Sequence, residues 1–266
     1  MQRQSHRLRL AAAVLSATCA IGAGAAEEGI DREDWHSMLR LYLWLPDVGV
    51  TSSFDYPSGG TVSLSQGQIL SALQFAFMGS GLVRKGRFSA VTDLIYLNLQ
   101  ADKTGRGVTL PAQLGGGFRT KLDAKLTGWV WTLAGGYTLW HNARANVDGL
   151  IGFRLLDLTS ENELTLTGPR GRELPRRFDT SITNWDAVVG VRGRVDLDDR
   201  WFVPYYIDVG TGDSDLTSSG YTGVGYAFDW GELTLTYRYL HYEMPDHMEL
   251  EDATFWGPAL GANVRF

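Results

Sequence analysis

The chain has 266 residues, a mean hydropathy of −0.12 and a formal net charge of −6. Its first 26 residues hold three arginines and no acidic residue, so the remainder carries −9, which argues against a nucleic-acid partner. The single cysteine, Cys19, also lies in this segment, so the rest of the chain has no cysteine for a disulfide or a thiolate metal site.

Residues 1–26 have the pattern of a cleaved export signal. Basic residues precede an apolar run from Leu10 to Ala26, whose last four small residues offer cleavage after Ala25 or Ala26. A retained anchor is the alternative, but a run of about 17 residues rich in Ala and Gly is marginal for a spanning helix. A lipoprotein signal at Cys19 fits poorly, because the residues before it match a lipobox badly. We therefore divide the chain into a signal peptide, 1–26, and an exported domain, 27–266.

The exported domain shows period-two alternation almost throughout, which predicts β-strands. In the first strand, 35–45, leucines occupy every second position from Leu39 to Leu45, so one face is purely leucine. Nine further strands are predicted at 74–84, 88–100, 123–140, 145–159, 180–196, 201–210, 217–228, 233–243 and 253–266. Most of them reach the roughly 9–11 residues that a tilted strand needs to cross a bilayer, whereas soluble strands average about 5–6. The lengths favour a membrane barrel.

The connections alternate in length. Four short polar turns lie at 85–87, 141–144, 198–200 and 229–232. Longer links lie between them at 46–73, 101–122, 160–179, 211–216 and 244–252. Short periplasmic turns and long outer loops are typical of outer-membrane barrels. We expect a closed antiparallel transmembrane barrel of about ten strands, with both termini on the periplasmic side.

Two parts of this layout stay open. Eight or twelve strands also fit, because 46–73 could hide a hairpin and 211–216 is short. Within 65–73, the pattern Ser65-x-x-Gln68 resembles a helix capping box and predicts one or two helical turns, with an extension of the next strand as the alternative.

The tryptophans form two groups, as expected for the two interfacial girdles of a barrel. The periplasmic group is Trp35, Trp140, Trp201 and Trp230, and the outer group is Trp44, Trp129, Trp131, Trp185 and Trp256. Strand parity places two of them, Trp44 and Trp140, inside the barrel instead.

The last strand ends the chain in phenylalanine, with apolar residues at every second position from Leu260 to Phe266. This resembles the signal read by the machinery that inserts barrels into the outer membrane.

More widely, the chain resembles the small, uncharacterised outer-membrane barrel proteins of proteobacteria. The matching segments are 41–46, 75–79, 93–97, 189–194, 199–201, 237–240 and the terminal strand. The resemblance implies a barrel in a Gram-negative outer membrane. It implies no substrate and no catalytic residue.

If Leu39, Ile151, Val191, Tyr237 and Val264 face lipid, the opposite faces of their strands line the lumen. The predicted lumen set of seven arginines and five aspartates is Arg40, Arg84, Asp93, Asp148, Arg154, Asp186, Arg192, Arg194, Asp196, Asp208, Arg238 and Arg265. The near-balance of charge predicts an ion-paired interior, because unpaired charge in a low dielectric is costly. We expect a structural, membrane-organising barrel plugged by its own side chains. A narrow small-solute channel is the alternative.

Two charged clusters fall in the outer links. The basic cluster consists of Arg106, Arg119, Lys121, Arg170, Arg172, Arg176 and Arg177. These side chains could contact lipopolysaccharide phosphates, or they could form a solvated loop face. An acidic cluster at 243–252 lacks ordered metal-ligand spacing. His36, next to Ser37, is the only histidine with a suggestive serine partner, and the sequence shows no recognisable catalytic arrangement. An outer-membrane hydrolase is therefore the least favoured alternative, and we expect no enzyme, no cofactor and no metal. The expected partners are outer-membrane lipid, lipopolysaccharide and the insertion machinery.

Overall fold

The computed structural model describes residues 30, 34–52, 60–106, 119–167, 173–245 and 250–266. The signal peptide predicted at 1–26 lies outside the described residues. No helix among those described is long and apolar enough to cross a membrane.

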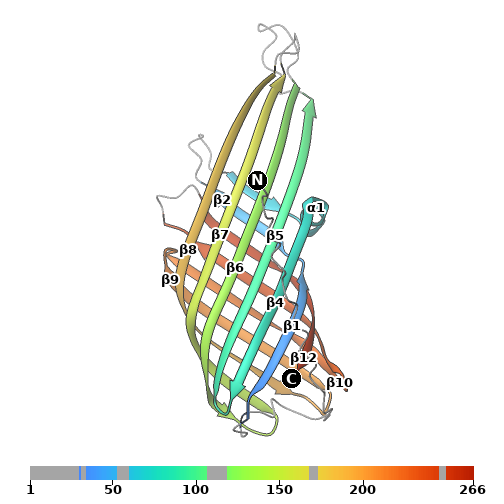
Figure 1. Cartoon of the computed structure of the whole chain (residues 1–266), viewed down its shortest axis with the longest axis vertical. Coiled ribbons are helices and arrows are strands. Elements are labelled where there is room, and N and C mark those ends of the chain that lie inside the picture. The colour runs from blue at the N-terminus through green and yellow to red at the C-terminus, as the bar shows by residue number, and fades with distance from the viewer. Residues whose placement is uncertain (1–29, 31–33, 53–59, 107–118, 168–172, 246–249) are drawn as a thin grey trace, which may run out of the picture.

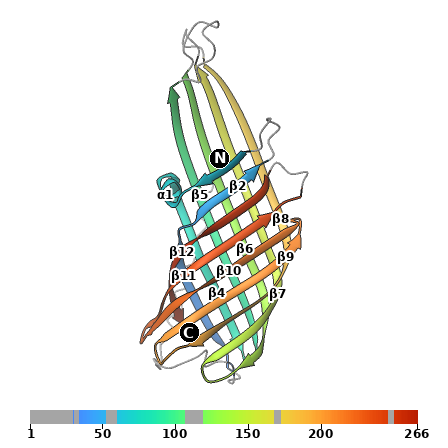
Figure 2. The same ribbon diagram turned by 180° about the vertical axis from the view of Figure 1, so that it is seen from behind.

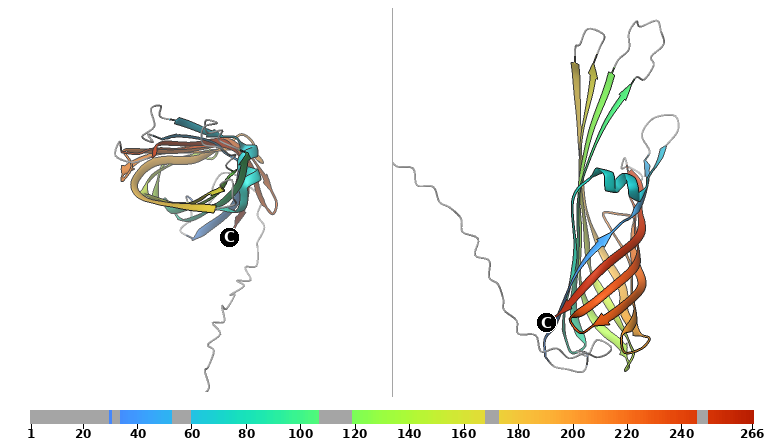
Figure 3. Two further views of the ribbon diagram at one scale, coloured as in Figure 1. Left: turned by 90° about the horizontal axis from the view of Figure 1, so that it is seen from above. Right: turned by 90° about the vertical axis from the view of Figure 1, so that its right-hand side faces the viewer.

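Ten antiparallel strands form a closed ring, which confirms the predicted fold class (Figures 1 and 2). Strand β1 closes the ring because Leu39 pairs with Gly81 of β4 on one side and with Val264 of β12 on the other. Figure 3 shows this ring end-on. The ring strands are β1 (His36–Trp44), β4 (Leu73–Lys85), β5 (Phe88–Arg106), β6 (Arg119–His141), β7 (Ala145–Thr167), β8 (Glu173–Asp196), β9 (Trp201–Gly212), β10 (Leu216–Phe228), β11 (Gly231–Glu243) and β12 (Leu250–Arg265).

The segment 46–73 contains a short hairpin and a helix. After a break at Leu45-Pro46, β2 (Asp47–Ser52) continues β1 along β12, and β3 (Gly60–Leu64) adds one strand to the outer edge of β2. Helix α1 (Gln66–Ala72) leads back to β4 across the barrel mouth (Figure 3). The Ser65 N–H donates to Gln68 Oε1 at 2.9 Å, as the capping pattern predicted.

Strands β5 to β8 correct the prediction of two long outer loops at 101–122 and 160–179. They contain 19, 23, 23 and 24 residues, against 12 or 13 in β9 to β11, and they rise well beyond the rim (Figures 1 and 3). Their pairing continues in register, with Asp102 opposite Asp123 and Glu163 opposite Arg177. The charged residues suggested loops, but the backbone pairing of the strands continues through them.

The short turns at one end of the barrel hold their shape through local hydrogen bonds. In the turn between β8 and β9, Asp198 Oδ1 accepts the N–H groups of Arg200 and Trp201, at 2.8 and 2.6 Å. These bonds favour the charged carboxylate and lower the pKa of Asp198. This Asx-type geometry explains why the boundary between these two strands could be predicted from sequence.

The inner face of the ring is polar and the outer face is apolar. Along β11 the buried residues are Glu232, Thr234, Thr236, Arg238, Leu240 and Tyr242, whereas the intervening Leu233, Leu235, Tyr237 and Tyr239 are exposed. The predicted lipid-facing residues Leu39 and Ile151 are 50% and 73% exposed. A soluble barrel would place its apolar rows inside, so this pattern is inverted.

Contacting aromatic rings encircle part of the wall at two heights. Near the short turns Phe88 packs against Tyr137 and Trp201 against Tyr226, with ring centroids 5.1 and 5.0 Å apart. Nearer the outer rim Tyr96 contacts Trp129, and a second contact chain joins Trp131, Phe153 and Trp185.

One predicted orientation in these bands is wrong. Trp44 is buried as parity predicted, but Trp140 is 52% exposed. A β-bulge between Thr138 and Trp140 shifts the register, so that both Leu139 and Trp140 face outward.

Candidate functional site: the barrel interior

The structure brings eleven of the twelve predicted lumen residues inside the wall, where they are buried or half-buried. They are Arg40, Arg84, Asp93, Asp148, Arg154, Asp186, Arg192, Arg194, Asp196, Asp208 and Arg238. Arg265, at the last position of β12, is exposed, and its guanidinium reaches back to Glu232. The interior charges form several separate groups.

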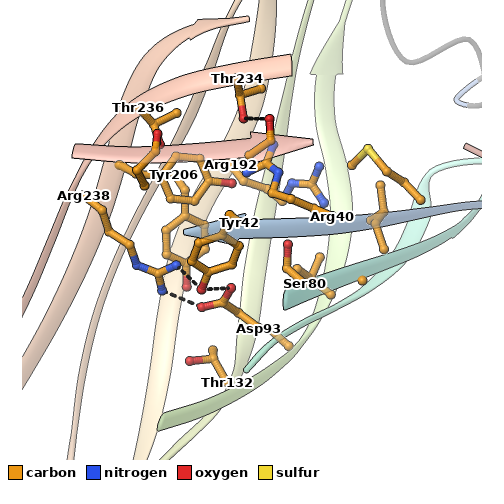
Figure 4. Close-up of a pocket in the computed structure, with 18 of the residues that line it drawn as sticks. Arg40, Tyr42, Ser80, Asp93, Thr132, Arg192, Tyr206, Thr234, Thr236 and Arg238 are labelled. Carbon is orange, nitrogen blue, oxygen red and sulfur yellow. Dashed lines mark hydrogen bonds and ion pairs between the residues drawn. The ribbon is translucent and has the colours of Figure 1, made fainter. Parts of the chain in front are cut away.

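The first group joins β1, β5 and β11. Arg238 Nη2 bonds to Asp93 Oδ2 at 2.5 Å, and Arg238 Nη1 donates to the Tyr42 hydroxyl at 2.8 Å (Figure 4). The Tyr42 hydroxyl in turn donates to Asp93 Oδ1 at 2.9 Å. The Arg238 guanidinium also lies 5.4 Å from the ring centres of Tyr42 and Trp44. These contacts tie opposite parts of the wall together across the lumen.

A second group surrounds Arg154 of β7. Its guanidinium donates to Asp208 Oδ2 at 2.5 Å, to Thr217 Oγ1 at 3.0 Å and to Thr132 Oγ1 at 3.2 Å. Tyr206 also donates to Asp208. Each side of the guanidinium therefore meets an oxygen, as a buried charge requires.

The third group is the most deeply enclosed. Arg84 of β4 pairs with Asp148 of β7, and the two side chains are 2% and 0% exposed. Thr138 Oγ1 lies 2.7 Å from both Arg84 Nη1 and Asp148 Oδ1. Removing one partner would leave the other charged in a dry environment.

A fourth group, near the end of the barrel with the short turns, centres on Glu232, which sequence reasoning assigned to a turn. Glu232 accepts from Arg194, Arg265 and Asn263, and Arg194 also pairs with Asp196. Arg40 donates its Nε–H to Asn263 Oδ1 at 2.7 Å. Extending the parity of Arg238 back through Thr236 and Thr234 would have placed Glu232 inside.

Asp186 differs from the other interior carboxylates. Its two oxygens accept the backbone N–H and the hydroxyl of Ser214, both at 2.9 Å. The described residues show no ion pair at Asp186. The predicted arginine–aspartate network therefore does not include Asp186. Ser214, in the link between β9 and β10, binds this carboxylate instead.

Apolar side chains fill the outer part of the interior, above the charged groups. Trp44, Met78, Ile95, Leu156, Leu240, Tyr242, Met244 and Ala259 form one buried cluster, which we call the apolar plug. Buried Ile69 of α1 faces a small cavity that Trp44 and Met78 also line. The sequence predicted an interior filled by the barrel's own side chains but did not identify this layer.

The outer charged clusters fall partly outside the described residues. Arg106, Arg119, Lys121, Arg176 and Arg177 lie in the paired parts of β5, β6 and β8, where register sets Arg106 opposite Arg119. Arg170 and Arg172 lie outside the described residues, as does 246–249 of the acidic cluster. Among the residues the structure describes, no group of three or more His, Cys, Asp or Glu is placed to hold a metal ion.

Comparison with known proteins yields structural neighbours only. No protein-family model matches the chain, and no curated protein matches its sequence. Among solved structures, it is similar to Ail, the attachment invasion locus protein of Yersinia pestis, at 10% identity and a TM-score of 0.36, covering 88% of this chain and 99% of that one. Neisserial surface protein A shows 14% identity, a TM-score of 0.30 and coverages of 87% and 97%. The toluene transporter TodX of P. putida shows 13% identity, a TM-score of 0.34 and coverages of 87% and 89%. These similarities are too weak to support an assignment of function.

Proposed function

We propose that the chain is an integral outer-membrane β-barrel of a Gram-negative bacterium, with a structural or membrane-organising role and an interior closed by its own side chains. The polar inner face, the exposed apolar rows and the two aromatic bands support a membrane setting. In water, the same outer wall would expose a continuous apolar belt, which soluble monomers avoid.

The apolar plug is the observation that supports a closed interior most directly. It lies between the charged groups and the outer mouth, and its Trp44, Leu156 and Tyr242 are almost inaccessible to solvent. The cavity beneath it measures about 70 Å³. Small-molecule sites usually measure roughly 300–1,000 Å³, so the interior offers no ordinary solute site.

The outer partners follow from the strands above the rim. Arg106, Arg119, Lys121 and Arg177 belong to these strands, where a lipopolysaccharide leaflet would surround the barrel. Guanidinium and ammonium groups there would bind its phosphates. The terminal strand with Phe266 would be read by the insertion machinery. The proposal assigns no reaction to the protein.

A narrow small-solute channel is the second candidate. It is favoured by the charged walls around the cavity, where arginines of β1, β7, β8 and β11 face the same space. The plug argues against it, because ions crossing the outer part of the lumen would lose their hydration without polar replacement.

Planar-bilayer recording separates the two candidates. We expect the folded wild-type protein to insert, as shown by protection of its membrane strands from protease, and to give no stepwise conductance. Boiled protein is the control for insertion. Reproducible conductance steps in wild type, altered in size or ion selectivity by Arg238→Ala, would contradict the closed interior and establish the channel.

A further inference from the structure

A depression lies on the outer wall of the barrel, across β1, β4, β5 and β6, which are side by side in Figure 1. It has a volume of about 450 Å³ and an almost wholly apolar lining. Ligand pockets usually measure roughly 300–1,000 Å³. Leu39, Val83 and Phe266 line the depression and are exposed, so it opens on the outer face of the wall. The depression is large enough for a ligand that reaches it from outside the barrel.

Strand register explains why the wall is hollow here. One row across the four strands consists of Leu39, Gly81, Thr92 and Leu133. A leucine stands at each end of this row, and smaller residues lie between them. A Cβ atom at Gly81 would meet only Thr92 Cγ2, at 3.3 Å, so the space above Gly81 is open. A groove bordered by leucine side chains fits a hydrocarbon chain that lies along the strands.

Two cations lie beyond the end of the groove that faces the short turns. Val83 lines the groove, and Lys85 is two residues farther along the same face of β4, about 7 Å away. Lys85 Nζ lies 5.6 Å from the ring centre of Trp35, and Arg87 follows in the turn. Both cations are exposed, and among the residues that the structure describes neither forms an ion pair, with Asp34 or with any other carboxylate. Lysine and tryptophan together are typical of the level of lipid headgroups, where a phosphate could meet these charges.

We propose that this groove binds an anionic phospholipid, with an acyl chain over Gly81 and the phosphate at Lys85 and Arg87. The inference rests on the proposed membrane setting with the short turns on the periplasmic side, because phospholipids form that leaflet of an outer membrane. Each part of the lipid then meets a matching surface. The acyl chain fills a hollow between apolar side chains, and the headgroup supplies the negative charge that the two cations lack.

Native mass spectrometry tests the acyl-chain part of the site. The probe is an equal mixture of phosphatidylglycerol and phosphatidylcholine, added to protein purified in detergent. We expect wild type to retain a single lipid and to prefer phosphatidylglycerol. In Gly81→Leu the new side chain occupies the groove, so the retention of both lipids should fall about tenfold. Ala187→Leu, at an exposed position on the outer face of β8, adds similar bulk away from the groove and should behave as wild type does.

Variants of the two cations test the headgroup part. Lys85→Gln should weaken the retention of phosphatidylglycerol about fivefold, by removing one of the two charges. Lys85→Gln combined with Arg87→Gln should abolish the preference for phosphatidylglycerol and leave the retention of phosphatidylcholine unchanged. Arg200→Gln, in another exposed short turn, is the charge control and should keep the preference. Slower migration after boiling, on a detergent gel, shows that each variant forms a closed barrel.

Failure of the lipid site differs from failure of the proposed function. A water-soluble chain whose migration does not change on boiling would refute the membrane setting and the lipid site together. A membrane-inserted barrel that retains phosphatidylglycerol equally well in wild type and Gly81→Leu would refute the lipid site alone. The same holds for a wild-type barrel that shows no preference between the two lipids.

Discussion

Replacing Ile151 with arginine is expected to destabilise the protein in a lipid bilayer by about 2–4 kcal/mol. Ile151 is 73% exposed on the outer face of β7, six residues from the periplasmic start of the strand at Ala145, which is close to the middle of a bilayer-spanning segment. A charged side chain there would have to remain among acyl chains. Unfolding by guanidinium chloride of protein refolded into lipid vesicles measures the change in the free energy of unfolding.

The control for this variant lies on the same outer surface near the periplasmic turn. Leu197 is 55% exposed and follows the end of β8, so Leu197→Arg would reach water and should cost only about 0–1 kcal/mol. In a soluble protein both substitutions would be surface changes within about 0.5 kcal/mol of wild type. Equal and negligible effects would therefore contradict the lipid-facing assignment.

Removing the carboxylate of Asp148 is expected to cost about 3–5 kcal/mol of unfolding free energy, because the buried guanidinium of Arg84 would lose the carboxylate that it pairs with. Both side chains are almost fully buried, and Thr138 is the neutral group that contacts both. The same vesicle titration measures Asp148→Ala.

Two further variants make this result specific. Asp157→Ala, on the outward face of the same strand, removes only a hydrogen bond from Thr183 and should cost about 1 kcal/mol or less. The double variant Arg84→Met with Asp148→Ala removes both charges and should recover most of the lost stability. If Asp148→Ala costs no more than Asp157→Ala, the interior of the barrel is hydrated and its ion pairs are not buried.

The strand layout at the periplasmic end was predictable from sequence. Short polar turns such as 198–200 end strands sharply, and period-two alternation persists between them, so the bounds of β7 and β9 were placed to the residue at that end. The inward arginines and aspartates followed from the same parity. Their individual partners did not, because pairing across the lumen depends on the curvature of the closed ring.

The outer end was less predictable, for three physical reasons. Above the rim no apolar face is needed, so charged segments of β5 to β8 looked like loops. The bulge after Thr138 shifts the inward–outward alternation by one residue, and no feature of the sequence marks it. The predicted orientation of Trp140 was therefore wrong. The plug gathers Met78 of β4, Leu156 of β7 and Met244 just after β11, and the sequence does not show which inward side chains meet across the lumen.

Fractionation of a Gram-negative host expressing the full chain tests the central claim most directly. We expect the protein in the outer-membrane fraction, and we expect an unboiled sample to migrate faster on a detergent gel than a boiled one, because the closed barrel resists unfolding by detergent. Recovery from the soluble periplasm, with the same migration before and after boiling, would contradict a membrane barrel with an apolar outer wall and a charged interior.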